Sequence, residues 1–476
     1  MRKEAGRDRY RGDLREYETA VEDGNEHSAP GRMRGSMTEG SPARVLIAFA
    51  VPMILGNMFQ QFYNLVDSMI VGKLVGADAL AAVGASNAIT MLFVMVAIGT
   101  GIGCSVVISQ LFGANKLSEM KSAISTALIS ILVFSLVLTV AGRLFSKGIL
   151  TLMGTPEDIF GQAQEYLNIY FYGFFFLFLY NAFSAVFNAL GDSRKPLYFL
   201  IFSSVLNIGL DILFVGSFRF GVAGAAWATL IAQAVSAALS FGVLSYKLAR
   251  MQTESYRRFD GELLVSMTRT AIPTIVQQSM VSIGMLLIQS VVNRFGSIFL
   301  AGYTAAVRID NMAIVPMVNA GNAVSTFVAQ NMGAQKPQRA KQGYHAGLVM
   351  AMGIGLLIGV LIFFFGDVFI ASFMDAETDA ASIAVGVQYI GVVSMFYFVM
   401  GAMNVTNAVL RGAGDMGWFM GITLVNLATR VLLTYLFADA TGGMIIMWAN
   451  PIGWTVGLVL AFVRYRQGAW KRIKLV

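Results

Sequence analysis

Cysteine, histidine and charge are all scarce in this chain of 476 residues, which has one cysteine, Cys104, and two histidines. A single cysteine excludes an internal disulfide bond and gives no cluster of metal ligands. Only 13% of the residues are Asp, Glu, Lys or Arg, whereas soluble domains typically have about 25%. The chain is therefore too poor in charge to be an ordinary soluble globular protein.

Hydrophobic residues make up 56% of the chain and gather in long runs, which indicates a polytopic membrane protein. The charges are concentrated at one end, because residues 1–40 hold 17 of the 61 charged residues. We expect residues 1–43 to form a hydrophilic, disordered tail. That tail has no short apolar segment behind a basic stretch, so we expect no cleaved signal peptide. The net charge of +7 arises elsewhere and does not imply nucleic acid binding.

Apolar runs of about 20 or more residues predict twelve transmembrane helices and an all-α fold. The expected spans are 44–72, 79–111, 122–142, 166–190, 196–216, 221–246, 268–293, 300–331, 342–365, 384–410, 417–438 and 443–463.

Lys and Arg are distributed unequally between the two sides of this arrangement, with 18 on the side of the C-terminal tail and six on the other. The positive-inside rule therefore places both termini in the cytoplasm. The expected segments are a tail (1–43), an N-terminal lobe (44–246), a cytoplasmic linker (247–267), a C-terminal lobe (268–465) and a basic tail (466–476).

The two predicted lobes are copies of one another. The sequence SQLFGANK, from Ser109, returns as AQNMGAQK from Ala329. Six spans per copy is an even number, so both lobes enter the membrane in the same orientation. We therefore expect a pseudo-two-fold axis along the membrane normal. Further matches pair Pro52 with Pro273, Tyr166 with Tyr389, and Gly191-Asp192 with Gly414-Asp415.

Polar side chains form a stripe on the first span. Asn57, Gln60, Asn64 and Asp67 recur at spacings of three and four residues and so share one helix face, which Gln61 broadens. The amides alone are equally typical of a helix-packing face. An intramembrane carboxylate costs about 2.5–3.5 kcal/mol on insertion scales, which favours a functional role for the aspartate.

The fifth span repeats this pattern with Asn207 and Asp211, four residues apart. We expect Asp67 and Asp211 to form a first-lobe site that exchanges a proton or holds Na⁺, with Asn207 beside it. A buried ion pair is the alternative, but these two spans hold no basic residue beyond Arg44, the first residue of the first span. Asn181, Ser184 and Asn188 form a further stripe on the fourth span.

The second lobe keeps the polar stripes and loses the acids. Its expected cavity-lining residues are Gln278, Gln289, Asp310, Asn426 and Arg430, and the pair Asn426-Arg430 corresponds to Asn207-Asp211. A carboxylate has thus become a guanidinium. We hypothesise that Arg430 or Arg308 pairs with Asp310, with simple packing roles as the alternative.

These motifs resemble the multidrug and toxic compound extrusion (MATE) family, in particular its DinF-like branch, over residues 44–465. The resemblance is carried by PMILGNMFQQFYNLVDSMIVGKLVG in the first span, SQLFGA and AQNMGA after the second and eighth, ALGDSRKP after the fourth and LNIGLDILF in the fifth.

The resemblance implies a V-shaped pair of lobes around a central cavity, and export of amphipathic organic cations by alternating access in exchange for H⁺ or Na⁺. It also implies a cation site at Asp67, Asn207 and Asp211, and a hinge at Pro52. The NorM-like branch has a glutamate in the seventh span, which this chain lacks near Val281. That difference favours coupling through the first lobe alone.

The expected function is therefore a secondary active multidrug exporter, with a lipid-linked precursor flippase of related fold as the alternative. An enzyme is not expected, because no phosphate loop or nucleophile–base pair occurs. We expect no cofactor, partners limited to drugs and membrane lipid, a monomer, and residence in a bacterial or archaeal plasma membrane.

Overall fold

The structure is a computed structural model that describes residues 36–75, 77–251, 253, 255–374, 379–473 and 475. Residues 1–35 of the predicted tail, and Lys474 and Val476 of the basic tail, lie outside the described residues. The described part is built from helices. They are α2 (Pro42–Leu74), α3 (Ala77–Gly113), α4 (Leu117–Leu152), α5 (Glu157–Ala189), α6 (Arg194–Asp211), η1 (Ile212–Ser217), α7 (Gly221–Ala249), α8 (Gly261–Val292), η2 (Asn293–Phe295), α9 (Gly296–Gly333), α10 (Pro337–Ala371), α11 (Ala380–Ser394), α12 (Tyr397–Ala413), α13 (Met416–Phe437), α14 (Met444–Gln467) and η3 (Ala469–Arg472).

Ten described helical segments are long and apolar enough to cross a membrane, and the bent pair α11–α12 makes an eleventh. One of the ten spans residues 261–333 and contains both α8 and α9, which a 3₁₀ turn joins. With those two helices counted separately, the chain crosses twelve times, as the sequence predicts. The chain is an all-α, multi-pass membrane protein. The 49° bend between α11 and α12 is a feature that the sequence did not predict.

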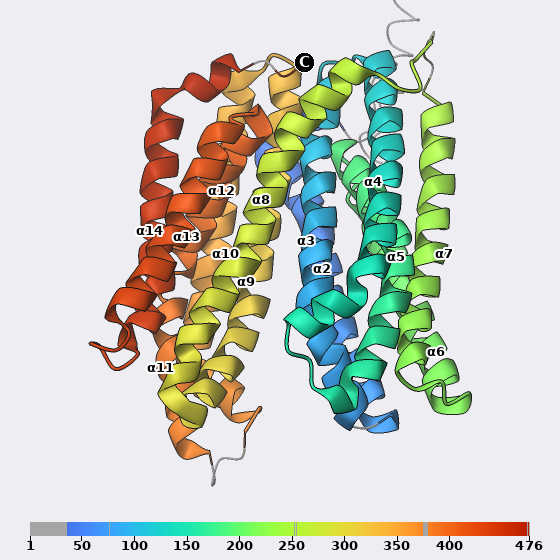
Figure 1. The fold of residues 1–476 in the computed structure, drawn as a ribbon. Helices are drawn as coiled ribbons and strands as arrows, with labels where there is room; N and C mark the ends of the chain where they lie inside the picture. Colours follow the sequence, from blue (N-terminus) through green and yellow to red (C-terminus); the bar gives the residue numbers. More distant parts are fainter. Residues whose placement is uncertain are drawn as a thin grey trace, which may run out of the picture. The chain divides into compact units, whose positions relative to one another are not determined.

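Helices α2 to α7 lie on one side of the bundle and α9 to α14 on the other, with α8 running obliquely between them (Figure 1). We call these groups the first and second halves, with α8 leading the second. The two halves meet where α3 and α9 end. A Cβ atom on Gly113 would overlap the backbone carbonyl of Gln330, and one on Gly333 would overlap the carbonyl of Gln110. The same close approach occurs twice, as a two-fold axis requires.

The repeated glutamines complete this contact. Gln110 Nε2 donates to the carbonyl of Gly412 at 3.1 Å, and Gln330 Nε2 donates to the carbonyl of Ala189 at 2.8 Å. Each bond joins the two halves, and each acceptor lies two residues before a repeated Gly-Asp pair. We call the contacts of Gln110, Gly113, Gln330 and Gly333 the clasp, and the end of the bundle that holds it the clasp end.

The first helix of each half crosses over to the other half near the clasp end. Leu46, Phe49 and Ala50 of α2 are buried in a core built mainly from α9, α10, α12 and α13. Helix α8 packs closely against α3 of the first half: a Cβ atom on Gly99 of α3 would lie 2.7 Å from the Cα atom of Ile275 of α8. Nearer the other end, Gly284 of α8 meets Leu427 of α13 instead. Each crossing helix is therefore anchored in both halves.

Two extended segments reinforce the clasp end. The chain between α7 and α8 lies along the first turns of α4, where Lys121 Nζ donates to the carbonyl of Met251 at 2.6 Å and to Thr253 Oγ1 at 2.9 Å. The segment before α2 lies on the α9–α10 corner, where Arg339 donates to the carbonyls of Met37 and Gly40. Met37 and Gly40 fall within the stretch predicted as a disordered tail, and the structure packs them against α9 and α10.

Candidate functional site

The structure brings together two carboxyl groups from different helices of the first half. Asp67 of α2 and Asp211 at the end of α6 lie within hydrogen-bonding reach of each other. Asp211 is fully buried. The Oδ1 atoms of both residues are buried with no hydrogen-bond partner among the described residues. Two adjoining carboxyl groups with open oxygens are suited to sharing a proton or a cation.

Asn207 completes this cluster, as the sequence predicts. Its amide nitrogen faces Asp211 Oδ2 at 3.2 Å, and its oxygen accepts from the Thr229 backbone at 3.1 Å, in the amide orientation that satisfies both groups. Directly after Asp211 the helix widens into a π-helical turn, η1. Such turns are frequent at functional sites. We call Asp67, Asn207 and Asp211 the acid cluster.

Three tyrosines that the sequence did not single out surround the acid cluster. Tyr63, Tyr166 and Tyr170 lie within electrostatic reach of Asp67, and the rings of Tyr166 and Tyr170 stack with centroids 5.9 Å apart. The repeat offered a signal for one of them, because Tyr166 corresponds to Tyr389 in the second half. Tyrosines are too common in apolar helices for the other two to stand out.

Within the described ranges, no group of three or more His, Cys, Asp or Glu is placed to hold a metal ion. The acid cluster instead offers carboxylate and amide oxygens, which are the ligand types that hard cations prefer. No Lys or Arg whose side chain the structure describes forms an ion pair with either aspartate. The donor set therefore fits a proton or an alkali cation.

The second half has a different polar cluster. Asp310 of α9 is buried and accepts a hydrogen bond from the Tyr397 hydroxyl at 2.8 Å. Arg430 of α13 lies within electrostatic reach of Asp310, Tyr303 and Tyr389. No direct ion pair joins Arg430 to Asp310 in the described part of the chain. Arg308, the other predicted partner, is exposed.

Among the remaining predicted residues, those of the stripe on α2 have different surroundings. Asn57 Nδ2 donates to Asn319 Oδ1 of α9 at 2.7 Å, so this residue joins the halves near the clasp end. Gln60, Gln61 and Asn64 are exposed, as polar side chains facing a water-filled space would be. Pro52 lies inside α2, which continues as a helix on both sides of it.

The other predicted lining residues are half-buried, except Asn426, which is buried. Asn181 donates to the carbonyl of Leu177 in its own helix, whereas the buried Ser184 Oγ and Asn188 Oδ1 have no partner among the described residues. Gln278 Nε2 lies 3.8 Å from Met95 Sδ across the two halves, Gln289 donates to Asn293, and Asn426 Nδ2 lies 3.0 Å from Met403 Sδ.

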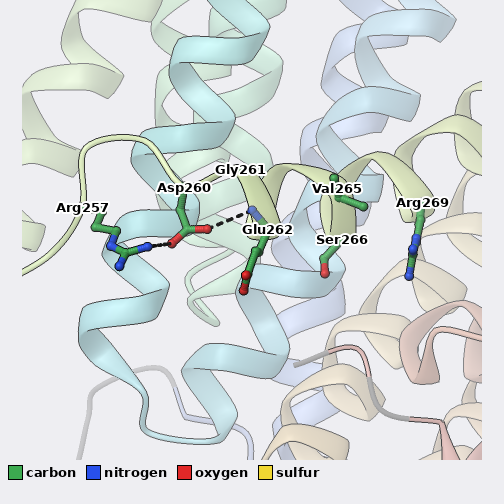
Figure 2. Close-up of a pocket in the computed structure, with 7 residues that line it drawn as sticks. All are labelled: Arg257, Asp260, Gly261, Glu262, Val265, Ser266 and Arg269. Carbon is green, nitrogen blue, oxygen red and sulfur yellow. Dashed lines mark hydrogen bonds and ion pairs between the residues drawn. The ribbon is translucent and has the colours of Figure 1, made fainter.

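A surface pocket lies at the start of α8, away from both clusters (Figure 2). Arg257 pairs with Asp260 at 3.4 Å, and Asp260 caps α8 by accepting from the backbone of Glu262 at 3.0 Å. These contacts fix the chain where it enters α8. The pocket thus belongs to the connection between the halves and contains none of the predicted site residues.

The chain matches the family model described as MatE over residues 52–213 and 273–436. The probable multidrug resistance protein YpnP of Bacillus subtilis is 32% identical over 447 residues, which cover 92% of this chain and 98% of the relative. The probable multidrug resistance protein YoeA of the same organism is 31% identical over 440 residues, covering 90% and 94%. A solved structure described as MATE in complex with MaL6 has the same fold, with a TM-score of 0.86, 24% identity, and coverage of 93% of this chain and all of that one.

Proposed function

The chain belongs to the MATE family of transporters, and on this premise we propose that it exports amphipathic organic cations in exchange for H⁺ or Na⁺. The substrate class rests on the relatives, which are named as probable multidrug resistance proteins. Those names do not favour the alternative of a lipid-linked precursor flippase. The observation that carries the exchange is the acid cluster, with its two adjoining carboxyl groups and open Oδ1 atoms.

The acid cluster can act as a coupling site because its occupancy changes its charge. Two carboxylates without a basic partner repel one another inside the membrane, and a bound proton or Na⁺ relieves that repulsion. Occupancy therefore stabilises the conformation in which Asp67 of α2 and Asp211 of α6 adjoin. An ion can shift the balance between two conformations only by its difference in affinity for them.

The position of the cluster relative to the clasp supports alternating access. Asp67 lies ten residues beyond Asn57, which is hydrogen-bonded to the other half, or roughly 15 Å along the helix. The cluster is thus on the far side of the packed clasp end. In this arrangement ions and substrates would reach it from the end opposite the clasp.

The clasp end would face the cytoplasm, because the loops on that side hold most of the Lys and Arg. Both termini would then be cytoplasmic, and the chain would reside in the plasma membrane as a monomer that needs no cofactor. The two lobes, residues 44–246 and 268–465, would be the moving bodies. The segment 247–267 would connect them, although its residues 247–249 and 261–267 are the ends of α7 and α8.

Efflux of ethidium from reconstituted vesicles under an imposed proton or sodium gradient tests the proposal. We expect Asp67→Asn and Asp211→Asn each to abolish the response to the gradient, because each removes a negative charge that the ion neutralises. Glu165→Gln is the matched control, since Glu165 is an exposed acid in the same half. Gradient-driven efflux by both aspartate variants at the wild-type rate would disprove the assignment of the acid cluster.

A further inference from the structure

Arg430 lies inside the second half and forms no ion pair with any described residue. Its Nε atom is buried and has no hydrogen-bond acceptor among the described residues. Asp310, the acid within electrostatic reach of it, is engaged by the Tyr397 hydroxyl at 2.8 Å. An ionised side chain in a membrane-spanning helix is costly and indicates a binding role.

The side chain of Arg430 is held in place by its neighbours. Gly453 of α14 leaves the room that its aliphatic part occupies, because a Cβ atom there would lie 2.5 Å from Arg430 Cγ and 2.9 Å from Cδ. The same Cβ atom would lie 3.1 Å from Asn426 Oδ1, one turn earlier on α13. The guanidinium is therefore positioned by packing and does not depend on a counter-charge for its orientation.

Tyr389 supplies a second donor within electrostatic reach of the guanidinium. Asn450 Nδ2 donates to the Tyr389 hydroxyl oxygen at 2.9 Å, so the hydroxyl proton remains available for another acceptor. The Tyr303 ring packs edge-on against the Tyr389 ring with centroids 5.2 Å apart, which fixes the phenol. Arg430 and Tyr389 thus present hydrogen-bond donors from two helices, α13 and α11.

We propose that Arg430 and Tyr389 bind the anionic oxygens of a carboxylate or phosphate group carried by an amphipathic substrate. A planar guanidinium matches the two oxygens of such a group, and a phenol adds a third donor. The proposal rests on the proposed export function and extends it. The first half would take the coupling cation, and the second half, at the corresponding position of the repeat, would take an anion.

Binding of matched probes to the purified protein tests this site. Norfloxacin carries a carboxylate, its methyl ester does not, and ethidium is a cation without an anionic group. We expect Arg430→Gln to weaken norfloxacin binding by about tenfold or more and to leave the ester and ethidium unchanged. Arg430→Lys should retain part of the preference, and Tyr389→Phe should lose part of it. Arg308→Gln, which alters an exposed arginine of the same half, is the control.

Equal losses for norfloxacin and its ester in Arg430→Gln would overturn the proposal, and so would unchanged norfloxacin binding together with unchanged lipid adducts. Unchanged ethidium binding shows that the variant is folded. The second arm is native mass spectrometry with phosphatidylglycerol. If Arg430→Gln loses lipid adducts but keeps norfloxacin binding, the result supports the site and assigns the anion to a lipid headgroup. Arg430-dependent norfloxacin binding without gradient-driven efflux would refute the export function alone, whereas efflux without Arg430-dependent selectivity would refute the site alone.

Discussion

The clasp makes a sharp prediction, because a single methyl group cannot be added at Gly113 without moving the two halves apart. The new Cβ atom would overlap the backbone carbonyl of Gln330, which has no side-chain rotamer to change. Overpacking of this kind costs about 1–3 kcal/mol. If the unclasped conformation relieves that cost, Gly113→Ala lowers the clasped population relative to the unclasped one by about 5- to 150-fold.

Distances between spin labels at the ends of α3 and α9 measure this shift. Cysteines at the exposed, repeat-related positions Lys116 and Lys336 supply the labels, after replacement of the buried Cys104 by alanine. We expect Gly113→Ala to add a long-distance population. Gly353→Ala, where nothing lies within 4 Å of the new Cβ atom, is the matched control.

The symmetry of the clasp sharpens the test further. Gly333→Ala should produce the same shift as Gly113→Ala, because it meets the Gln110 carbonyl in the same way. The variant with both substitutions should shift the population by less than the sum of the two single shifts. Separation of the halves caused by the first methyl group also removes the overlap made by the second. A distance distribution for Gly113→Ala identical to that of the Gly353→Ala control would refute the reasoning.

Three further predictions concern the contacts that reinforce the clasp end. Lys121→Ala removes two hydrogen bonds to the segment before α8 and should lower stability by about 1–3 kcal/mol, seen as faster limited proteolysis between α7 and α8. Arg339→Ala should speed hydrogen exchange in residues 37–41, while Arg308→Ala should not, and equal exchange in both variants would contradict this. Asn57→Ala loses the 2.7 Å bond to Asn319 and should add about 1 kcal/mol in favour of the unclasped conformation, measured with the same spin labels.

Most of the fold could be predicted from the sequence, because long apolar runs identify membrane helices almost directly. The helix ends were harder: α4 continues to Leu152, ten residues beyond the expected span, since a helix does not end where the membrane does. The bend between α11 and α12 has no proline or glycine at Met395–Phe396 to indicate it. Its position depends on how the two helices pack.

The sequence predicted some residues of the candidate site and misplaced others, because it does not show how the helices pack. Helical spacing placed Asp67 on a polar face, and the structure brings it to Asp211. The same spacing grouped Asn57 with it, yet Asn57 binds the other half, because α2 changes neighbours along its length. Periodicity identifies which residues share a face. It does not say which helix that face meets.

The change of neighbours along α2 and α8 links the clasp to the acid cluster. The clasp-end part of α2 is buried in the core of the second half, while Asp67, roughly 22 Å beyond Pro52, adjoins Asp211 of the first half. Any relative movement of the halves must therefore be absorbed within α2, and likewise within α8. Opening of the clasp then alters the strain on the helix that carries Asp67. If the acid cluster binds the ion as proposed, ion binding and clasp opening would be coupled through one continuous helix, without contact between the two sites.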